Sequence, residues 1–282
     1  MSILKAFWST LRPPHEERLL WERCWHDETV QVWEKPGRRE LRFSNHIIQS
    51  ALTLANPDHL VLRYPQHMML ALLLRPQPQR VLHLGLGAGS LPTFLHRSFP
   101  KLQQVVIELI PEVAEAAHLF FNLPQDSRLE VRIADAYEAI PDLTEDFDLI
   151  FLDTFNASGA PERMNSEALL STLRERLAPG GWAVGNAWSK VKTFPEYRKR
   201  WTRVFPYAMQ VSTQPRYGNV IFFGTLDCPL PKRNELRQRA SDGDIGGFLV
   251  LDELTLESGE AVMYTDDRVS TFRRLTLRSA IV

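Results

Sequence analysis

This sequence has little cysteine, no long hydrophobic run and no excess of either charge. Its two cysteines, Cys24 and Cys228, are too few and too far apart for a disulfide framework. The apolar N-terminal stretch, residues 1–8, is too short to span a membrane and has no signal-peptide core. Because 33 basic residues face 34 acidic ones, no overall field attracts nucleic acid or a membrane surface. We therefore expect a cytoplasmic protein with reduced thiols and neither of those partners.

Several catalytic signatures are also missing. The sequence has no phosphate-binding Walker loop, no Gly-x-Ser-x-Gly nucleophile motif, and no cluster of histidines and cysteines at metal-ligand spacing. We therefore expect no metal and no pyrophosphate-specific site.

What the sequence does contain is a series of short β-rich segments that each end in glycine or a carboxylate. They run Val81-Leu82-His83-Leu84-Gly85-Leu86-Gly87-Ala88-Gly89, Val105-Val106-Ile107-Glu108, Leu129-Glu130-Val131-Arg132-Ile133-Ala134-Asp135 and Phe147-Asp148-Leu149-Ile150-Phe151-Leu152-Asp153. Helical patterns separate them, which is typical of an α/β fold with an open parallel sheet. Such sheets bind ligands at the carboxyl ends of their strands.

The glycine loop and the first acid suit a nucleoside-like ligand. Gly85, Gly87 and Gly89 allow positive φ angles and close approach of the backbone to a ligand. A tight strand-to-helix turn without a ligand would explain the same pattern. Glu108 follows the second strand, where a carboxylate can accept two hydrogen bonds from a ribose diol, although an isolated acid there can also be a surface residue.

Two further acids end the third and fourth strands. Asp135 can accept a hydrogen bond from an adenine amine, and it can equally cap a helix at 136–140. Asp153 would lie beside the glycine loop, or it too could be a cap. Taken together in this order, the three acids and the glycine loop predict a site for an adenosine-containing ligand.

The rest of the chain predicts a small antiparallel unit before the main sheet and further elements after it. Residues 1–20 are expected to form a tail or short helix, and the turn at 35–38 to join strands at 29–34 and 39–43. The remaining expected elements are a strand at 47–51, helices at 64–74, 165–177, 194–205 and 232–240, a strand at 182–186, and a hairpin formed by 207–212 and 219–224.

Over residues 29–225 the chain resembles the spermidine synthase (polyamine aminopropyltransferase) family, as a divergent member. The resemblance rests on the glycine loop, Glu108, residues 147–153, and on Asn45-His46-Ile47-Ile48-Gln49-Ser50, Tyr64-Pro65-Gln66-His67-Met68 and Ala134-Asp135-Ala136. It implies a doubly wound, mostly parallel, seven-stranded sheet like that of S-adenosylmethionine methyltransferases (Rossmann-like), preceded by the small β domain. The implied units are 1–63, the catalytic domain 64–228, and a C-terminal extension 229–282.

The resemblance also implies roles for single residues. Gln49 and Tyr64 would line the donor and amine site, Glu108 would bind ribose, Asp135 would contact adenine, and Asp153 would open the catalytic segment. The family has an aspartate in its glycine loop where this chain has Ala88, and a catalytic aspartate where it has Asn156. Those acids hold the donor ammonium and deprotonate the attacking amine, so both charges are missing here. Ala88 would not repel the carboxylate of ordinary S-adenosylmethionine.

The resemblance favours a cytoplasmic, homodimeric transferase of polyamine biosynthesis. Its co-substrate would be decarboxylated S-adenosylmethionine or S-adenosylmethionine, and its acceptor a small amine. Asp153, Asn156 and Tyr64 are the expected catalytic residues. Two alternatives follow from the missing acids: a methyltransferase that uses S-adenosylmethionine, and a nucleoside-binding relative without turnover.

Overall fold

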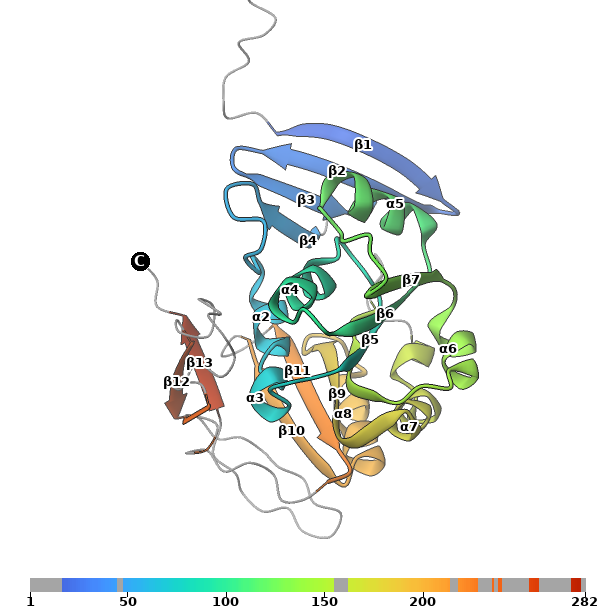
Figure 1. Ribbon diagram of the computed structural model, residues 1–282, viewed down its shortest axis with the longest axis vertical. Helices are drawn as coiled ribbons and strands as arrows, with labels where there is room; N and C mark the ends of the chain where they lie inside the picture. Colours follow the sequence, from blue (N-terminus) through green and yellow to red (C-terminus); the bar gives the residue numbers. More distant parts are fainter. Residues whose placement is uncertain are drawn as a thin grey trace, which may run out of the picture.

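The computed structural model describes residues 17–44, 48–154, 162–213 and 218–227, three residues near 235–239, and two strands at 254–258 and 275–279. It has a four-stranded antiparallel sheet above a larger sheet of seven strands (Figure 1). In the part of the chain described, no helix combines the length and the apolar character that crossing a membrane requires. The same residues contain no group of three His, Cys, Asp or Glu arranged to hold a metal.

The small sheet has the strand order β1-β2-β3-β4. Its strands are β1 (Arg18–Trp25), β2 (Glu28–Lys35), β3 (Arg38–Arg42) and β4 (Ile48–Thr53). The predicted turn at 35–38 joins β2 to β3, and Gly37 adopts a φ of +74° there. The expectation of a tail or helix up to residue 20 is wrong at its end, because Arg18 already pairs with Glu34 across β1 and β2.

The large sheet has the order β10-β11-β9-β8-β5-β6-β7. Its strands are β5 (Arg80–Leu84), β6 (Gln103–Glu108), β7 (Leu129–Ile133), β8 (Phe147–Leu152), β9 (Leu177–Trp188), β10 (Tyr207–Ser212) and β11 (Asn219–Thr225). Strands β7, β6, β5, β8 and β9 are parallel, and β11 runs antiparallel to both neighbours. The predicted seven-stranded, mostly parallel sheet is therefore confirmed.

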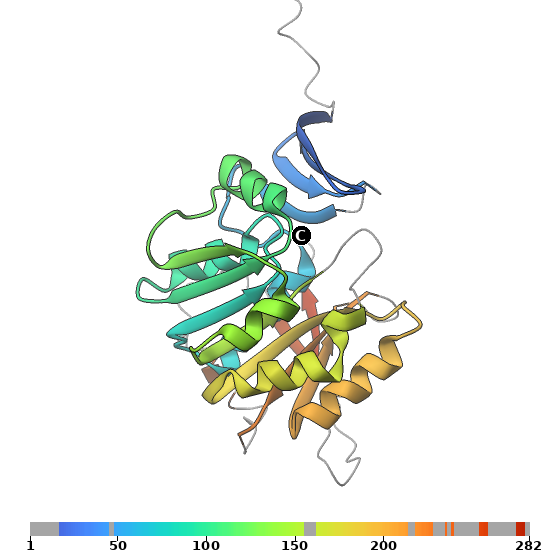
Figure 2. The same cartoon turned by 90° about the vertical axis from the view of Figure 1, so that its right-hand side faces the viewer.

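Helices cover both faces of this sheet (Figure 2). They are α2 (Arg63–Met68), α3 (Ala71–Leu74), α4 (Ser90–Ser98) and α5 (Pro111–Phe120) on one side, and α6 (Ala136–Ala139), α7 (Glu167–Glu175) and α8 (Phe194–Val204) on the other. Two 3-10 helices, Ile140–Asp142 and Glu162–Asn165, complete the set. α5 also packs against the small sheet, so one apolar cluster joins the two sheets.

Two predicted elements differ in their bounds. The helix expected at 64–74 is divided into α2 and α3, because the N–H groups of Leu70 and Leu72 bond to carbonyls three residues back. The strand expected at 182–186 begins earlier, since Leu177 already pairs with Phe147 and a register shift follows. Most of the helix expected at 232–240 lies outside the described residues. Strands β12 (Leu254–Ser258) and β13 (Leu275–Ser279) form a separate hairpin, and β13 contacts β10.

Candidate functional site

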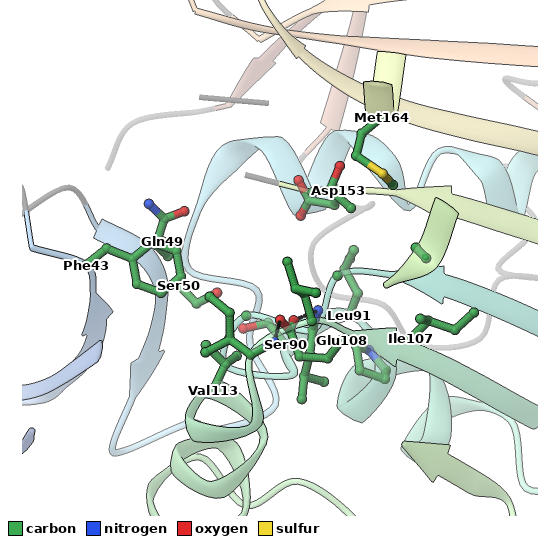
Figure 3. A pocket seen from close by; sticks show the side chains of 18 of the residues that line it. Phe43, Gln49, Ser50, Ser90, Leu91, Ile107, Glu108, Val113, Asp153 and Met164 are labelled. Carbon is green, nitrogen blue, oxygen red and sulfur yellow. Dashed lines mark hydrogen bonds between the residues drawn. The ribbon is translucent and has the colours of Figure 1, made fainter. Parts of the chain in front are cut away.

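A cavity of about 360 Å³ lies where the carboxyl ends of β5, β6, β7 and β8 face the small sheet. Figure 3 shows Glu108 with Ser50 and Ser90 in one part of the cavity, and Asp153 with Met164 in another. The predicted site residues that line it are Gln49, Tyr64, Gly85, Gly87, Glu108, Asp135 and Asp153. Residues far apart in the sequence therefore converge on one cavity.

The glycine loop passes between the end of β8 and β4, with no room for a side chain at Gly85 or Gly87. Gly85 has a φ of +92°, and a Cβ atom there would lie 2.4 Å from the carbonyl oxygen of Asp153. Gly87 has a φ of +54°, and its Cβ would lie 2.6 Å from Ser50 Oγ. Both conformations favour glycine, so the loop and the cavity floor depend on these two residues. Gly89 instead caps the N-terminus of α4 at a φ of +74° and does not line the cavity.

Glu108 is buried and hydrogen-bonded to the backbone around it. Its Oε2 atom accepts from the N–H of Leu86 at 2.8 Å, and its Oε1 accepts from the N–H of Ile110 at 2.9 Å. Burial raises the pKa of the Glu108 carboxyl, while backbone N–H bonds oppose this rise. Glu108 is therefore not a surface acid.

Asp135 has two roles in the structure. Its Oδ1 accepts a hydrogen bond of 3.0 Å from the N–H of Tyr137 and so caps α6. Its Oδ2 forms an ion pair with Arg163, whose guanidinium lies 5.9 Å from the centre of the Tyr137 ring. The carboxylate also lines the cavity, so the two interpretations left open by the sequence are compatible.

Asp153 lies directly after β8 and is held from two sides. The side-chain amide of Asn186 donates to its Oδ1 at 2.8 Å, and the hydroxyl of Tyr64 interacts with the same carboxyl. Burial raises the pKa of Asp153 to about 6, and the hydrogen bonds from Asn186 and Tyr64 oppose this rise. A carboxyl with such a pKa is suited to accept a proton near neutral pH.

Tyr64 connects Asp153 to the small sheet. Its hydroxyl lies 3.2 Å from the backbone carbonyl oxygen of Gln49 on β4. Burial raises the pKa of the Tyr64 phenol, and the nearby Asp153 charge raises it further. The phenol therefore stays protonated as a hydrogen-bond donor. The Tyr64 side chain lies between the two sheets, next to Asp153, the candidate catalytic base.

Negative charge dominates the cavity wall. Its acids are Glu28, Glu108, Asp135 and Asp153, and among the described lining residues Arg163 is the only Arg or Lys. Because Arg163 is paired with Asp135, its charge is largely compensated. One side-chain oxygen of Glu28 is buried without a hydrogen-bond partner among the described residues. Such a wall suits a ligand that carries positive charge.

One sequence-based expectation about the site is wrong, and another is not tested. Ala88 is 2% exposed and packs in the apolar cluster between the sheets, and it is not part of the cavity wall. The expectation that its side chain borders the donor is therefore wrong, because the loop turns this Cβ toward the core. Asn156 lies outside the described residues, so its expected role stays a prediction.

Four further residues around the site were hardly predictable from the sequence. Ser50 accepts a hydrogen bond of 3.1 Å from the N–H of Ala88. Asn186 lies behind Asp153, while Glu28 and Arg163 line the cavity. Asn186 stands at the carboxyl end of a predicted strand, which was the one available signal. Glu28 and Arg163 lie in segments without a recognisable motif.

Comparison with known proteins places the chain among transferases. A family model described as S-adenosyl-L-methionine-dependent methyltransferase matches residues 98–190. The polyamine aminopropyltransferase of Chromobacterium violaceum is 29% identical over 215 residues, covering 76% of this chain and 82% of that protein. The eEF1A lysine and N-terminal methyltransferase of Bos taurus is 34% identical over 128 residues, covering 40% of this chain and 18% of that protein.

A structural relative shares the fold. The crystal structure of a probable spermidine synthase from Corynebacterium glutamicum superposes with a TM-score of 0.68 at 20% identity, covering 81% of this chain and 88% of that chain. The predicted resemblance to the spermidine synthase family and the predicted transferase class are both confirmed by these relatives. The relatives differ in the group that their names say they transfer.

Proposed function

We propose that this protein binds an S-adenosyl-type donor in the cavity and transfers an aminopropyl group from it to a small amine. The observation that carries this proposal is the excess of carboxylates in a cavity bounded by a glycine loop. A sulfonium donor and an amine acceptor both bring positive charge, and carboxylates compensate charge that leaves water. Gly85, Gly87, Gln49, Glu108 and Asp135 would hold the donor.

The proposed chemistry is an in-line displacement. The amine nitrogen attacks the carbon next to the donor sulfur, the carbon–sulfur bond breaks, and its electron pair stays on sulfur as a neutral thioether. The nitrogen must lose a proton, which passes to the carboxylate of Asp153. Tyr64, with its hydroxyl between Asp153 and the carbonyl of Gln49, would orient the acceptor. Positioning of the two reactants provides most of the acceleration in such reactions.

Methyl transfer from S-adenosylmethionine is the second candidate. The methyltransferase family model covers residues 98–190, which contain Glu108, Asp135 and Asp153. The aspartate that holds the ammonium of the decarboxylated donor in the spermidine synthase family is replaced by Ala88. Because Ala88 packs in the apolar cluster and does not line the cavity, this replacement does not itself decide between the two donors, and the family model is the observation that favours methyl transfer.

One binding series separates these possibilities. The purified protein is titrated calorimetrically with decarboxylated S-adenosylmethionine, S-adenosylmethionine and methylthioadenosine, and each donor is then incubated with putrescine. Tighter binding of the decarboxylated donor together with formation of spermidine supports aminopropyl transfer. Preference for S-adenosylmethionine supports methyl transfer, and binding of methylthioadenosine without any turnover supports a non-catalytic nucleoside-binding protein. Absence of binding by all three contradicts the proposal. The homodimer and the cytoplasmic location implied by the resemblance stay predictions.

A further inference from the structure

Two asparagine side chains form a hydrogen-bonded chain behind Asp153, on the side away from the cavity. Asn186 on β9 donates through Nδ2 to Asp153 Oδ1 at 2.8 Å. Asn219 on β11 donates through Nδ2 to Asn186 Oδ1 at 2.9 Å. The neighbouring strands β8, β9 and β11 each contribute one member, at or just beyond the same edge of the sheet. Asn186 is 3% exposed and is not part of the cavity wall.

The orientation of the two asparagine amides determines whether an NH₂ group or a carbonyl oxygen faces Asp153. Because Asn219 presents N–H groups to the carbonyl oxygen of Asn186, the amide of Asn186 must turn its own NH₂ group toward Asp153. An NH₂ group can only donate, and a carboxylate can only accept. The ionised form of Asp153 therefore gains the hydrogen bond, and its Oδ1 atom is held in one orientation.

We propose that Asn186 and Asn219 are positioning residues for Asp153, which hold its carboxyl oriented and ionised for proton transfer in the cavity. This inference rests on the proposed function, in which the ionised carboxylate of Asp153 accepts the proton of the attacking amine. Asn186 acts on Asp153 directly, and Asn219 acts only through Asn186. Neither is assigned contact with the donor or the acceptor.

The surroundings of Asp153 make this hydrogen bond important. The titratable groups that face it are Tyr64 from α2 and Tyr197 from α8, both neutral at physiological pH because burial raises their pKa values. No Lys or Arg is among the groups that affect the carboxyl in the described structure. Its ionised form is therefore stabilised by hydrogen bonds from Asn186 and Tyr64 instead of by an opposite charge.

The inference is tested by titrating Asp153 itself. Full-length protein carrying ¹³C-labelled aspartate carboxyls is titrated by NMR, and the Asp153 signal is assigned by its loss in Asp153→Asn. Asn186→Ala should raise the midpoint by about one pH unit, since a hydrogen bond to a charged group is lost. Asn219→Ala should raise it in the same direction by a smaller amount. Ser189→Ala is the matched control, because it removes both hydrogen bonds between the Ser189 hydroxyl and the Gly218 backbone beside Asn219 and leaves the two asparagine side chains intact.

A reversal variant sharpens the test. In Asn219→Asp the new carboxylate can only accept, so Asn186 should turn its NH₂ toward position 219 and its carbonyl oxygen toward Asp153. The Asp153 midpoint should then rise above that of Asn219→Ala. Because Asn219 is farther from Asp153, the titration midpoint of Asp153 can be measured in the Asn219 variants even if Asn186→Ala does not fold.

Two results overturn the inference. One is an unchanged Asp153 midpoint in folded Asn186→Ala, or in both Asn219 variants where Asn186→Ala does not fold. The other is an equal change in Ser189→Ala. The titration needs no substrate, so it gives an answer even if no donor supports turnover and the proposed function fails. If turnover is found, the acidic limb of the pH–rate profile should move with the NMR midpoint in each variant.

Discussion

The backbone N–H of Leu86 donates a hydrogen bond of 2.8 Å to Glu108 Oε2, which ties the glycine loop after β5 to the acid at the end of β6. The second oxygen of the same carboxylate accepts from Ile110 at 2.9 Å. The backbone N–H groups of Leu109 and Gly87 also act on this carboxylate, whose two oxygens together offer about four acceptor positions. Glu108 therefore supports the shape of the loop, and its proposed role in binding the donor ribose stays a prediction.

Glu108→Gln should weaken the binding of methylthioadenosine by roughly 1.5–3 kcal/mol, the usual contribution of a hydrogen bond to a charged group. The amide provides one acceptor oxygen in place of two, and its NH₂ group would oppose a backbone N–H. Isothermal titration calorimetry measures the change. Glu130→Gln, at an exposed acid on the neighbouring strand β7, is the control and should bind as the wild type does. Unchanged affinity in Glu108→Gln would remove Glu108 from the site.

Gly85→Ala should both destabilise the protein and abolish donor binding. The new Cβ would lie 2.4 Å from the carbonyl oxygen of Asp153, at a φ of +92°. Gly37→Ala is a close control, because Gly37 has a φ of +74° and nothing within 4 Å of its Cβ position. Left-handed backbone alone costs about 1–2 kcal/mol, so urea unfolding should show a larger loss at Gly85 than at Gly37. Equal losses would show that the close contact with β8 is relieved without cost.

Strands β5, β6, β7 and β8 of the large sheet could be predicted from sequence because each is a short apolar run that is followed closely by glycine or an acid. β1 could not, since Leu19 and Trp21 flank a register shift that breaks the alternation of side chains. The convergence of Glu108, Asp135 and Asp153 was predictable from topology alone. Parallel strands end on one edge of a sheet, so residues distant in sequence meet there.

Side-chain directions inside the glycine loop could not be predicted. Whether the side chain of Ala88 faces the ligand or the core depends on the positive φ angles of Gly87 and Gly89, which composition does not specify. The hydrogen bonds that link the two asparagines to Asp153 could not be predicted from the sequence either. Asn186 and Asn219 are separated by 33 residues and meet only because β9 pairs with β11.

Ala88→Asp should destabilise the protein and should not shift its binding preference toward the decarboxylated donor. Its carboxylate would be buried in the apolar cluster without a cationic partner, which costs several kcal/mol. Ser90→Asp is the informative comparison, because Ser90 lines the cavity and begins α4, where an acid suits the helix dipole. We expect Ser90→Asp to fold and to favour the decarboxylated donor in competition binding. A well-folded Ala88→Asp protein with that preference would contradict the placement of Ala88.

Asn156→Asp should increase aminopropyl transfer to putrescine if the family pattern applies. A carboxylate attracts the acceptor ammonium and can take its proton, whereas an amide does neither well. General-base assistance contributes about 10²–10⁴-fold in rate, so the gain should appear in turnover and leave donor affinity unchanged. Spermidine formation is followed chromatographically at saturating donor. Brisk formation by the unmodified protein would show that Asp153 alone suffices as the base.

Asp153→Asn should raise the stability of the protein at pH 8 and abolish its turnover. Burial raises the pKa of Asp153 to about 6 in the folded protein, above the ordinary value of 3.8. Between those two values the folded state binds more protons than the unfolded state, so this group's contribution to stability falls as the pH rises from about 4 to 6 and is constant above. The neutral amide avoids that loss, and Asp153→Asn should be more stable than the wild type at pH 8 by up to about 3 kcal/mol.

The same variant should lose turnover, because an amide cannot accept the proton of the attacking amine. Urea unfolding at pH 8 and near pH 4 measures the first effect, and the gain in stability should disappear at the lower pH, where wild-type Asp153 is protonated. Asp146→Asn, which removes an exposed carboxylate just before β8, is the matched control. A gain for Asp153→Asn that is equal at both pH values would not come from ionisation. It would mean that folding leaves the pKa of Asp153 near its ordinary value, so that burial does not prepare this carboxyl to accept a proton near neutral pH.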